Sequence, residues 1–433
     1  MFRIIVIKFF PFLYLALSIL ILIYVFHKDQ FIYEGNKFEY YKIYYIIIVL
    51  NLIFSITIIL INKIRIYFFI ILLSVFFSIY LFEIYLNILK LNSVDLEYKI
   101  KEYKKIYNKD YDTRSKSEIY KDLSLENKNV SIAIFPSLFL NQQIDLYPLS
   151  GISNSKTIYD NENGYYFIYD SDRFGFNNPD TIWDEDEIDY ILVGDSFIHG
   201  ASVNPPFDIA SILREKTNHK ILNLSYGGNG PLLQLATLKE YLPKKVNNII
   251  WFYYEGNDNY DLNNELKNNK LLNYLSDENF NQNLRYKQNK VDIILKDFLN
   301  FELNNQIKKN EDNLIDIIKL NKLRKILHKK EIHNSFESII NKVKKISSEK
   351  NANLYFVYLP EHARYKLKFY NDENRKNVIS LIKNLNINII DIHQEVFLKS
   401  QDPLDFFPFR MYGHYNEKGY KIISNSLYNL LTN

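Results

Sequence analysis

Three long apolar runs mark the start of the sequence, and no run of comparable length follows them. They cover residues 9–26, 43–61 and 66–82. An α-helix rises about 1.5 Å per residue, so the 18 residues of the first run span about 27 Å, close to the hydrocarbon thickness of a bilayer. The pattern therefore predicts three transmembrane helices in a membrane anchor of residues 1–91.

The first run has a second interpretation as a cleaved signal peptide, because Arg3 and Lys8 give it a positively charged front. The small residues that a cleavage site requires do not follow, since the run ends in His27, Lys28 and Asp29. We therefore favour an uncleaved membrane helix.

Positive charges favour one orientation of this anchor. Four basic residues share one side of a three-span arrangement: Arg3, Lys8, Lys63 and Arg65. The excess of Lys and Arg in cytoplasmic loops assigns that side to the cytoplasm, although lysines on the opposite side reduce the difference. An odd number of crossings then places everything after the third span outside the cytoplasm.

Residues 92–146 are charged and carry apolar positions at helical spacing, as at Leu96, Ile100 and Tyr103. Such a segment is typical of a solvated connector. We interpret it as a stalk that leads into the globular domain.

From residue 147 to residue 433, short apolar runs alternate with longer amphipathic segments. The runs lie at residues 190–193, 221–224, 249–254, 354–358 and 387–390, and the amphipathic segments at 208–217, 231–242, 335–350, 374–385 and 417–431. Short continuous apolar runs indicate strands buried on both faces, and their alternation with helices is typical of a parallel sheet. We predict a three-layer α/β/α domain of the flavodoxin-like kind. Residues 259–333 interrupt the alternation with a long polar stretch, which predicts a helical insertion.

Composition excludes several functions. The chain has 53 basic and 50 acidic residues, and a net charge of +3 leaves no electrostatic footprint for nucleic acid. It has no cysteine, which rules out disulfides, thiolate zinc sites and a cysteine nucleophile. The histidines lack metal-ligand spacing, so we expect neither a metal nor a cofactor.

A serine follows the first predicted strand of the domain, in the sequence Gly194-Asp195-Ser196. At a strand end and before a helix, its hydroxyl would be exposed to substrate and its N–H could bind an oxyanion. Taken alone, however, the motif favours an Asp/Ser turn that caps a helix.

Three further motifs favour the interpretation of Ser196 as a nucleophile. Gly227 and Gly228 lie in a glycine-dense turn after the second predicted strand, where backbone N–H groups can point into a cleft. Asn257 follows the third strand and offers an amide donor, and His414 precedes the last predicted helix. A parallel sheet brings such segments together at the carboxyl ends of its strands.

In this order the four motifs resemble the SGNH hydrolase superfamily, which is named for its Ser, Gly, Asn and His, over residues 189–433. The resemblance implies that Ser196 is the nucleophile and His414 the general base. It also implies an oxyanion hole made by the Ser196 N–H, Gly228 and the Asn257 amide, and an Asp195 that orders the loop. Residues 171–179 look like a segment of bacterial membrane-anchored relatives found with surface polysaccharide synthesis, which extends the likeness toward residue 147.

The sequence departs from the family at one position. The family usually has an aspartate two or three residues before its histidine, and here Tyr412 and Met411 stand there. Without a carboxylate to fix the tautomer and stabilise imidazolium, turnover should fall. Asp402 and Asp405 are the nearest candidates for the third member of the triad, and a backbone carbonyl could also orient the ring.

The resemblance and the outward topology lead to an expected function. We expect a serine esterase or O-acyltransferase, anchored in the bacterial inner membrane by several spans with its catalytic domain outside the cytoplasm. Its substrates would be acyl esters, preferably acetyl esters, of a cell-surface or exported glycan. The expected partners are the acylated glycan or another ester, the lipid bilayer and, for transfer, a membrane protein that supplies acyl groups.

A second class of function stays open at this point. The missing aspartate favours a catalytically weak or inactive protein that uses the SGNH fold to bind glycan or to scaffold an export or polysaccharide system. Acyl-ester chemistry requires Ser196 and His414 to meet, so a structure separates the two interpretations.

Overall fold

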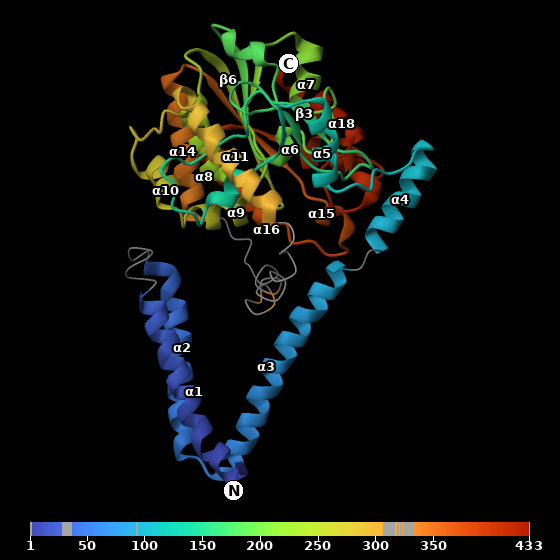
Figure 1. Ribbon diagram of the computed structural model, residues 1–433. Coiled ribbons are helices and arrows are strands. Elements are labelled where there is room, and N and C mark those ends of the chain that lie inside the picture. Colours follow the sequence, from blue (N-terminus) through green and yellow to red (C-terminus); the bar gives the residue numbers. More distant parts are fainter. Residues whose placement is uncertain are drawn as a thin grey trace. The chain divides into compact units, whose positions relative to one another are not determined.

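The computed structural model describes residues 2–27, 37–91, 94–305, 317, 320, 323 and 333–432. The chain forms two compact units (Figure 1). One comprises Met1–Asn92 with Asn310–Leu327, and the other comprises Ser93–Lys309 with His328–Asn433.

The described residues of the first unit form the helices α1 (Phe2–His27), α2 (Lys37–Ile59) and α3 (Asn62–Leu91). Two stretches of the described residues are long and apolar enough to cross a membrane, Phe9–Phe26 of α1 and Asn62–Leu86 of α3. Helix α2 contributes the shorter apolar stretch Tyr44–Ile56, so the predicted third span is not confirmed. The Ser18 hydroxyl donates to Asn51 Oδ1 at 2.8 Å and links α1 to α2, as polar groups between apolar helices commonly do.

The second unit is built on a five-stranded sheet. Its strands are β4 (Ile188–Val193), β5 (Ile221–Asn223), β6 (Val246–Tyr254), β7 (Asn353–Leu359) and β8 (Asn388–Asp391). All neighbours are parallel, in the order β5-β4-β6-β7-β8. The predicted parallel α/β fold is confirmed, and each strand lies where an apolar run predicts it.

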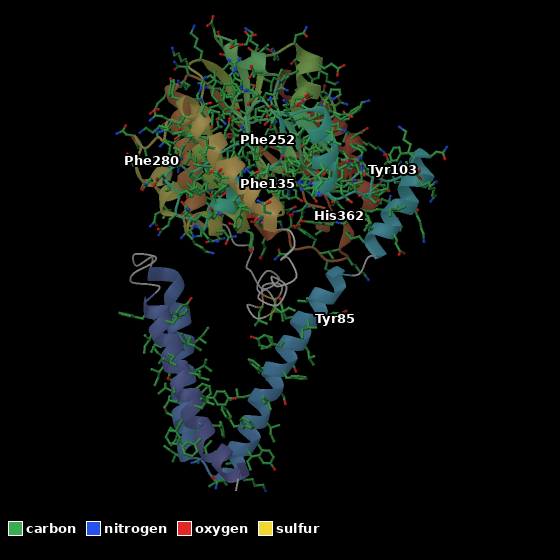
Figure 2. The ribbon with its side chains drawn as sticks, viewed as in Figure 1. Tyr85, Tyr103, Phe135, Phe252, Phe280 and His362 are labelled. Carbon is green, nitrogen blue, oxygen red and sulfur yellow. The ribbon has the colours of Figure 1, made fainter. Side chains whose placement is uncertain are left out.

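Helices cover both faces of this sheet because successive side chains of a strand point to opposite sides. Ile191 and Trp251 pack on one face beneath α8 (Pro231–Tyr241), α14 (Asn334–Glu349) and α16 (Glu373–Asn384). Leu192 and Phe252 pack on the other face beneath α7 (Ile209–Thr217) and α18 (Glu417–Thr432). The three layers are visible in Figure 1, and Figure 2 labels Phe252 inside the second of these cores.

A second, smaller sheet precedes the large one and was not predicted. Its strands are β1 (Val130–Ile132), β2 (Lys156–Ile158) and β3 (Ile168–Asp170), with β1 parallel and β3 antiparallel to β2. Strands of three residues are too short to show a hydrophobic period in the sequence. Helices α4 (Val94–Tyr107) and α5 (Lys116–Glu126) precede this sheet within the same unit.

Much of the polar stretch at residues 259–333 is helical where the structure describes it. Helices α9 (Asp258–Glu265), α10 (Asn269–Ser276) and α11 (Gln288–Asn305) occupy it, and residues 306–316 and most of 318–332 lie outside the described residues. The buried Glu265 carboxylate accepts hydrogen bonds from the N–H groups of Gly230 (2.6 Å) and Leu232 (2.8 Å) at the start of α8. The insertion therefore supplies the cap of a core helix.

Short helical turns complete the unit: α6 (Ser196–His199), α15 (Ala363–Lys366), α17 (Ile392–Glu395), η2 (Pro136–Phe139), η3 (Asp180–Asp184), η4 (Leu284–Tyr286), η6 (Phe397–Lys399), η7 (Pro403–Phe406) and η8 (Pro408–Arg410).

Replacing Ile191 by Ala tests the placement of β4 as an interior strand of the packed sheet. Ile191 is completely buried, so we expect the substitution to lower the free energy of unfolding by about 2–5 kcal/mol. Urea unfolding followed by tryptophan fluorescence reports on this unit, because Trp183 and Trp251 both lie in it. The control Tyr286→Ala, at a residue 89% exposed, should change stability by less than about 0.5 kcal/mol. Equal effects of both substitutions would contradict this fold.

Candidate active site

Ser196 stands at the carboxyl end of β4 as the first residue of α6. Asp195 caps this turn, because its Oδ1 accepts a hydrogen bond of 2.9 Å from the Phe197 N–H. A side chain at Gly194 would meet Ile198 at 2.7 Å, so the tight turn requires glycine there. Asp195 thus orders the loop, in the way that the family resemblance implies.

His414 meets Ser196 directly, although 218 residues separate them in the chain. Its Nε2 lies 2.8 Å from the Ser196 Oγ, which is hydrogen-bonding distance. The Phe197 ring packs against the imidazole with its centroid 4.6 Å away. The structure therefore brings together the nucleophile and the base that the sequence proposes.

The other imidazole nitrogen contacts a carboxylate that the sequence reasoning missed. Nδ1 of His414 lies 3.1 Å from Glu162 Oε1, and the His414 backbone N–H donates to Glu162 Oε2 at 2.6 Å. A side chain at Gly413 would meet Glu162 Oε2 at 2.6 Å, so this glycine lets the carboxylate approach. Glu162 occupies the place of the third member of a Ser-His-acid triad.

The two aspartates that the sequence suggests as the acid of the triad form ion pairs with other residues. Asp402 forms an ion pair with Arg410, and Asp405 forms one with Lys418. Both choices rested on proximity in sequence to His414, whereas Glu162 precedes it by 252 residues. The interpretation of Asp402 and Asp405 as the acid is therefore corrected, and no local motif marks Glu162.

Glu162 lies at the tip of the hairpin between β2 and β3. Two backbone hydrogen bonds extend the ladder past these strands, from Tyr159 N–H to Phe167 O (2.9 Å) and from Phe167 N–H to Asp160 O (2.7 Å). The small sheet therefore presents a rigid support for the acid. The segment after α4 secures the same tip, because the Asp112 N–H donates to Gly164 O at 2.9 Å.

Helix α4 contacts this hairpin through a tyrosine. Tyr103, labelled in Figure 2, packs its ring against Gly164, where a Cβ would lie 2.3 Å from the ring. Gly164 also has a φ of +96°, a conformation that favours glycine. The segment expected to be a stalk thus contributes to holding Glu162 in position.

A second, partly buried carboxylate lies beside the triad. Asp160 Oδ2 is 4.0 Å from His414 Nδ1, and the Ser202 hydroxyl lies between them, 3.3 Å from Asp160 Oδ1 and 3.4 Å from Nδ1. Burial and the negative charge of Glu162 raise the pKa of Asp160 to about 6. Two acids therefore face the imidazole from the same side.

These carboxylates set the protonation of His414. Burial lowers the pKa of its imidazole, but the charge and hydrogen bond of Glu162, with smaller contributions from Asp160 and Asp195, outweigh burial and raise the pKa to about 9. Burial raises the pKa of the Glu162 carboxyl, but the positive charge and hydrogen bonds of His414 outweigh burial and lower this pKa below its ordinary value. The site strongly stabilises imidazolium, the form that His414 takes after accepting a proton.

The proposed oxyanion donors lie at the ends of the strands on either side of β4. Gly228 has a φ of +73°, and a Cβ there would lie 2.6 Å from Ser137 Oγ. Within the described part of the chain, neither the Ser196 N–H nor the Gly228 N–H donates to a protein acceptor. Asn257 begins the turn into α9, and its Oδ1 is buried without a partner there. The Asn257 Nδ2 group donates no hydrogen bond among the described residues, so it can donate to a ligand.

His199 connects the nucleophile turn to the small sheet. It is fully buried, its Nδ1 lies 3.1 Å from Ser225 O, and Tyr159 stacks on it at 5.3 Å between ring centroids. Burial lowers the pKa of His199 to about 4, so the ring is neutral at physiological pH. It acts as a packing residue that fixes the hairpin against α6.

Asp160, Glu162 and His414 also place ligand atoms within 4.8 Å of one another, which is close enough to hold a metal ion. A cation there would have to displace the hydrogen bonds that Glu162 accepts from His414. We therefore assign these residues to proton transfer.

Comparison with known proteins gives a likeness in fold. No protein-family model and no curated protein matches the sequence. The chain is similar to the solved structure of a lipolytic protein of the G-D-S-L family from Desulfitobacterium hafniense, with 13% identity and a TM-score of 0.32 over 56% of this chain and 99% of that one. It is also similar to the acetyl xylan esterase AlAXEase, with 11% identity and a TM-score of 0.31 over 56% of this chain and 99% of that one.

A third similar structure is the YXIM protein of Bacillus subtilis, with 12% identity and a TM-score of 0.32 over 57% of this chain and 56% of that one. The chain is thus similar to GDSL-type lipolytic proteins and to an esterase. Similarity at this level assigns no activity, so the function proposed below rests on the geometry of the site.

Replacing Glu162 by Gln tests its role as the acid of the triad. The substitution removes the charge that stabilises imidazolium and nearly preserves the side-chain shape, so we expect kcat to fall roughly 10³- to 10⁴-fold. Hydrolysis of p-nitrophenyl acetate measures this change. Asp402→Asn serves as the matched control and should stay within about twofold of the wild type. A large loss in the control with none in Glu162→Gln would restore the assignment from the sequence.

The pH dependence of the reaction gives an independent test. Only neutral His414 accepts a proton, so the labelling rate of Ser196 by a fluorophosphonate should rise with pH through the pKa of His414. We expect a midpoint well above the ordinary 6.5 in the wild type, because Glu162 raises that pKa. In Glu162→Gln the midpoint should move to lower pH, since the charge is gone and burial remains. Identical midpoints in the two proteins would contradict the role of Glu162.

Proposed function

We propose that this protein is a membrane-anchored serine esterase or O-acyltransferase that acts on acyl esters of a glycan. One observation carries the proposal: Ser196 Oγ, the His414 imidazole and the Glu162 carboxylate form a continuous hydrogen-bonded chain with steps of 2.8 and 3.1 Å. Such a chain activates a hydroxyl for nucleophilic attack.

The first half of the reaction forms an acyl-enzyme. Ser196 gives its proton to Nε2 of neutral His414 while Oγ bonds to the ester carbonyl carbon, and the carbonyl oxygen becomes an oxyanion. The N–H groups of Ser196 and Gly228 and the Asn257 amide stabilise this oxyanion. The intermediate collapses when the C–O bond to the alcohol breaks, and the imidazolium returns its proton to that alcohol.

The second half releases the acyl group. His414 takes a proton from water or from a sugar hydroxyl, whose oxygen attacks the acyl carbon and displaces Ser196, which regains the proton. Glu162 keeps the Nδ1 proton in place and stabilises the imidazolium in both halves. Hydrolysis and transfer differ only in the acceptor, and transfer would need a membrane partner that supplies acyl groups.

The surroundings of Gly228 favour a polar substrate. A cavity of about 400 Å³ adjoins this residue, and its lining includes Ser137, Asn141, Asn264 and Lys267. Side chains of this kind hydrogen-bond hydroxyl groups, whereas a long acyl chain would need an apolar channel. A short acyl group, such as acetyl, on a carbohydrate fits this environment, and an extracellular or exported glycan is the substrate class that we propose.

The apolar helices support anchoring in a membrane. We propose that α1 and α3 cross the bilayer, that α2 forms the third span, and that the catalytic unit lies outside the cytoplasm of a bacterial inner membrane. The basic residues Lys63 and Arg65 in the first turn of α3 support this orientation. The alternative of an inactive glycan-binding scaffold rested on the lack of an acid beside His414, and Glu162 lies there.

Replacing Ser196 by Ala provides the direct test of the chemistry. We expect hydrolysis of p-nitrophenyl acetate by the full chain to fall at least roughly 10³-fold, because the nucleophile is removed. A fluorophosphonate should label the wild type and leave Ser196→Ala unlabelled. Activity should persist in EDTA, whereas loss of activity in EDTA would instead assign Asp160, Glu162 and His414 to a metal site. A folded wild type with neither hydrolysis nor labelling would favour the scaffold.

The absence of cysteine allows a clean test of topology. Tyr286 is 89% exposed, so Tyr286→Cys introduces one accessible thiol into the catalytic unit. In intact spheroplasts we expect a membrane-impermeant maleimide to label this thiol. Labelling only after the membrane is broken would place the unit in the cytoplasm, as two crossings instead of three would require.

A further inference from the structure

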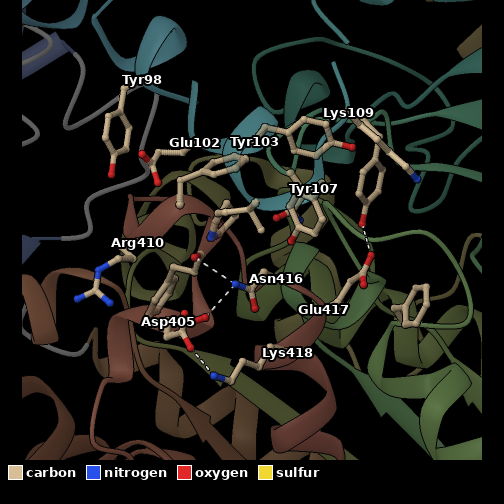
Figure 3. A pocket seen from close by; sticks show the side chains of 17 residues that line it. Tyr98, Glu102, Tyr103, Tyr107, Lys109, Asp405, Arg410, Asn416, Glu417 and Lys418 are labelled. Carbon is tan, nitrogen blue, oxygen red and sulfur yellow. Dashed lines mark hydrogen bonds and ion pairs between the residues drawn. The ribbon is translucent and has the colours of Figure 1, made fainter. Parts of the chain in front are cut away.

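A cavity whose lining includes none of Ser196, Glu162 and His414 lies between α4 and the segments on either side of His414. It measures about 640 Å³, within the range of roughly 300–1,000 Å³ that small-molecule sites occupy. Figure 3 shows its two walls: Tyr98, Tyr103 and Tyr107 of α4 face the segments on either side of His414. Asn163, the neighbour of Glu162, also lines it.

Aromatic rings form much of this cavity's surface. Tyr107 is 57% exposed and Tyr98 43% exposed, so large ring faces are open to a ligand. The Tyr103 ring packs against Tyr107 with centroids 5.0 Å apart, and against Phe409 of the opposite wall at 6.3 Å. The rings are therefore held in place and lose little freedom when a ligand binds.

Several of the charged groups that line the cavity already have partners. Lys418 forms an ion pair with Asp405, and the Glu417 carboxylate accepts a hydrogen bond of 2.6 Å from the Tyr165 hydroxyl. Arg410 pairs with Asp402. An ionic ligand would have to break these contacts, whereas a neutral ligand with many hydroxyls can hydrogen-bond to their remaining donors and acceptors.

The wall that precedes His414 is held in an unusual conformation. Phe409 and Arg410 have φ values of +51° and +62°, in a region that bulky side chains rarely occupy. The Phe409 ring is held there by Tyr103 and Tyr111, at 6.3 and 6.4 Å between centroids. Strain of this kind persists where the surroundings impose it, commonly at sites that bind ligands.

We propose that this cavity binds a neutral saccharide. A pyranose ring has an apolar C–H face that stacks on tyrosine and a rim of hydroxyls that fits the paired carboxylates and the Asn163 and Asn416 amides. In this assignment the cavity holds an unmodified part of the glycan while an ester group reaches Ser196. The assignment therefore rests on the proposed function.

Binding to the full chain in detergent tests the proposal. The Ser196→Ala protein is titrated with hexasaccharides of β-1,4-linked xylose, glucose, mannose and N-acetylglucosamine, and binding is measured by calorimetry. We expect at least one to bind, with roughly fivefold weaker binding in a protein that also carries Tyr107→Ala, since a stacking face is lost. Tyr107→Phe keeps the ring and should bind as Ser196→Ala does, and the exposed control Tyr286→Ala should also bind unchanged.

Three results would overturn the saccharide site. They are no binding of any of the four sugars at millimolar concentration, equal binding by the Tyr107→Ala protein, and binding of an anionic polymer such as polygalacturonate in place of the neutral sugars. Fluorophosphonate labelling of the wild type distinguishes failure of the saccharide site from failure of the proposed catalysis. Labelling without sugar binding removes only the saccharide site, and sugar binding without labelling removes only the proposed catalysis.

Discussion

The contact between Glu162 and His414 joins parts of the protein that would otherwise be independent. The imidazole is carried by the segment before the last helix of the large sheet, whereas the carboxylate comes from a hairpin of the small sheet. The hairpin reaches its place because Tyr159 stacks on His199 and because Tyr103 packs on Gly164. Without this contact, Ser196 and His414 would form a pair that lacks a carboxylate hydrogen-bonded to the base.

The second acid, Asp160, has opposite effects on two requirements of the proposed reaction. Asp160 and Glu162 repel each other where they are only partly open to water, and the imidazolium offsets that repulsion. A strongly stabilised imidazolium lowers the energy of the step in which Ser196 loses its proton. It also lowers the fraction of His414 that is neutral and ready to act at pH 7. The site therefore favours alkaline conditions.

Local patterns predict the large sheet and its helices well, because each strand is a short apolar run and each helix has an amphipathic spacing. They also predict Ser196 and His414, which stand in recognisable motifs at element ends. The small sheet escapes prediction because three-residue strands show no period. Glu162 escapes because its partner is remote in sequence, so that only the packing of the β2–β3 hairpin against the α6 turn reveals it. The third membrane span stays a proposal, since α2 has only the apolar stretch Tyr44–Ile56.

Because Glu162 comes from the β2–β3 hairpin, the choice of the first residue in a truncated protein decides whether the triad is complete. A fragment that starts at residue 189, where the family resemblance begins, would keep the nucleophile, the base and the proposed oxyanion donors yet lose its carboxylate. A fragment that starts at residue 147 would regain Glu162 but leave Gly164 without the ring that covers it. A fragment that starts at residue 94, after the last apolar helix, keeps α4 whole. It therefore retains the Tyr103 ring that covers Gly164 together with the triad.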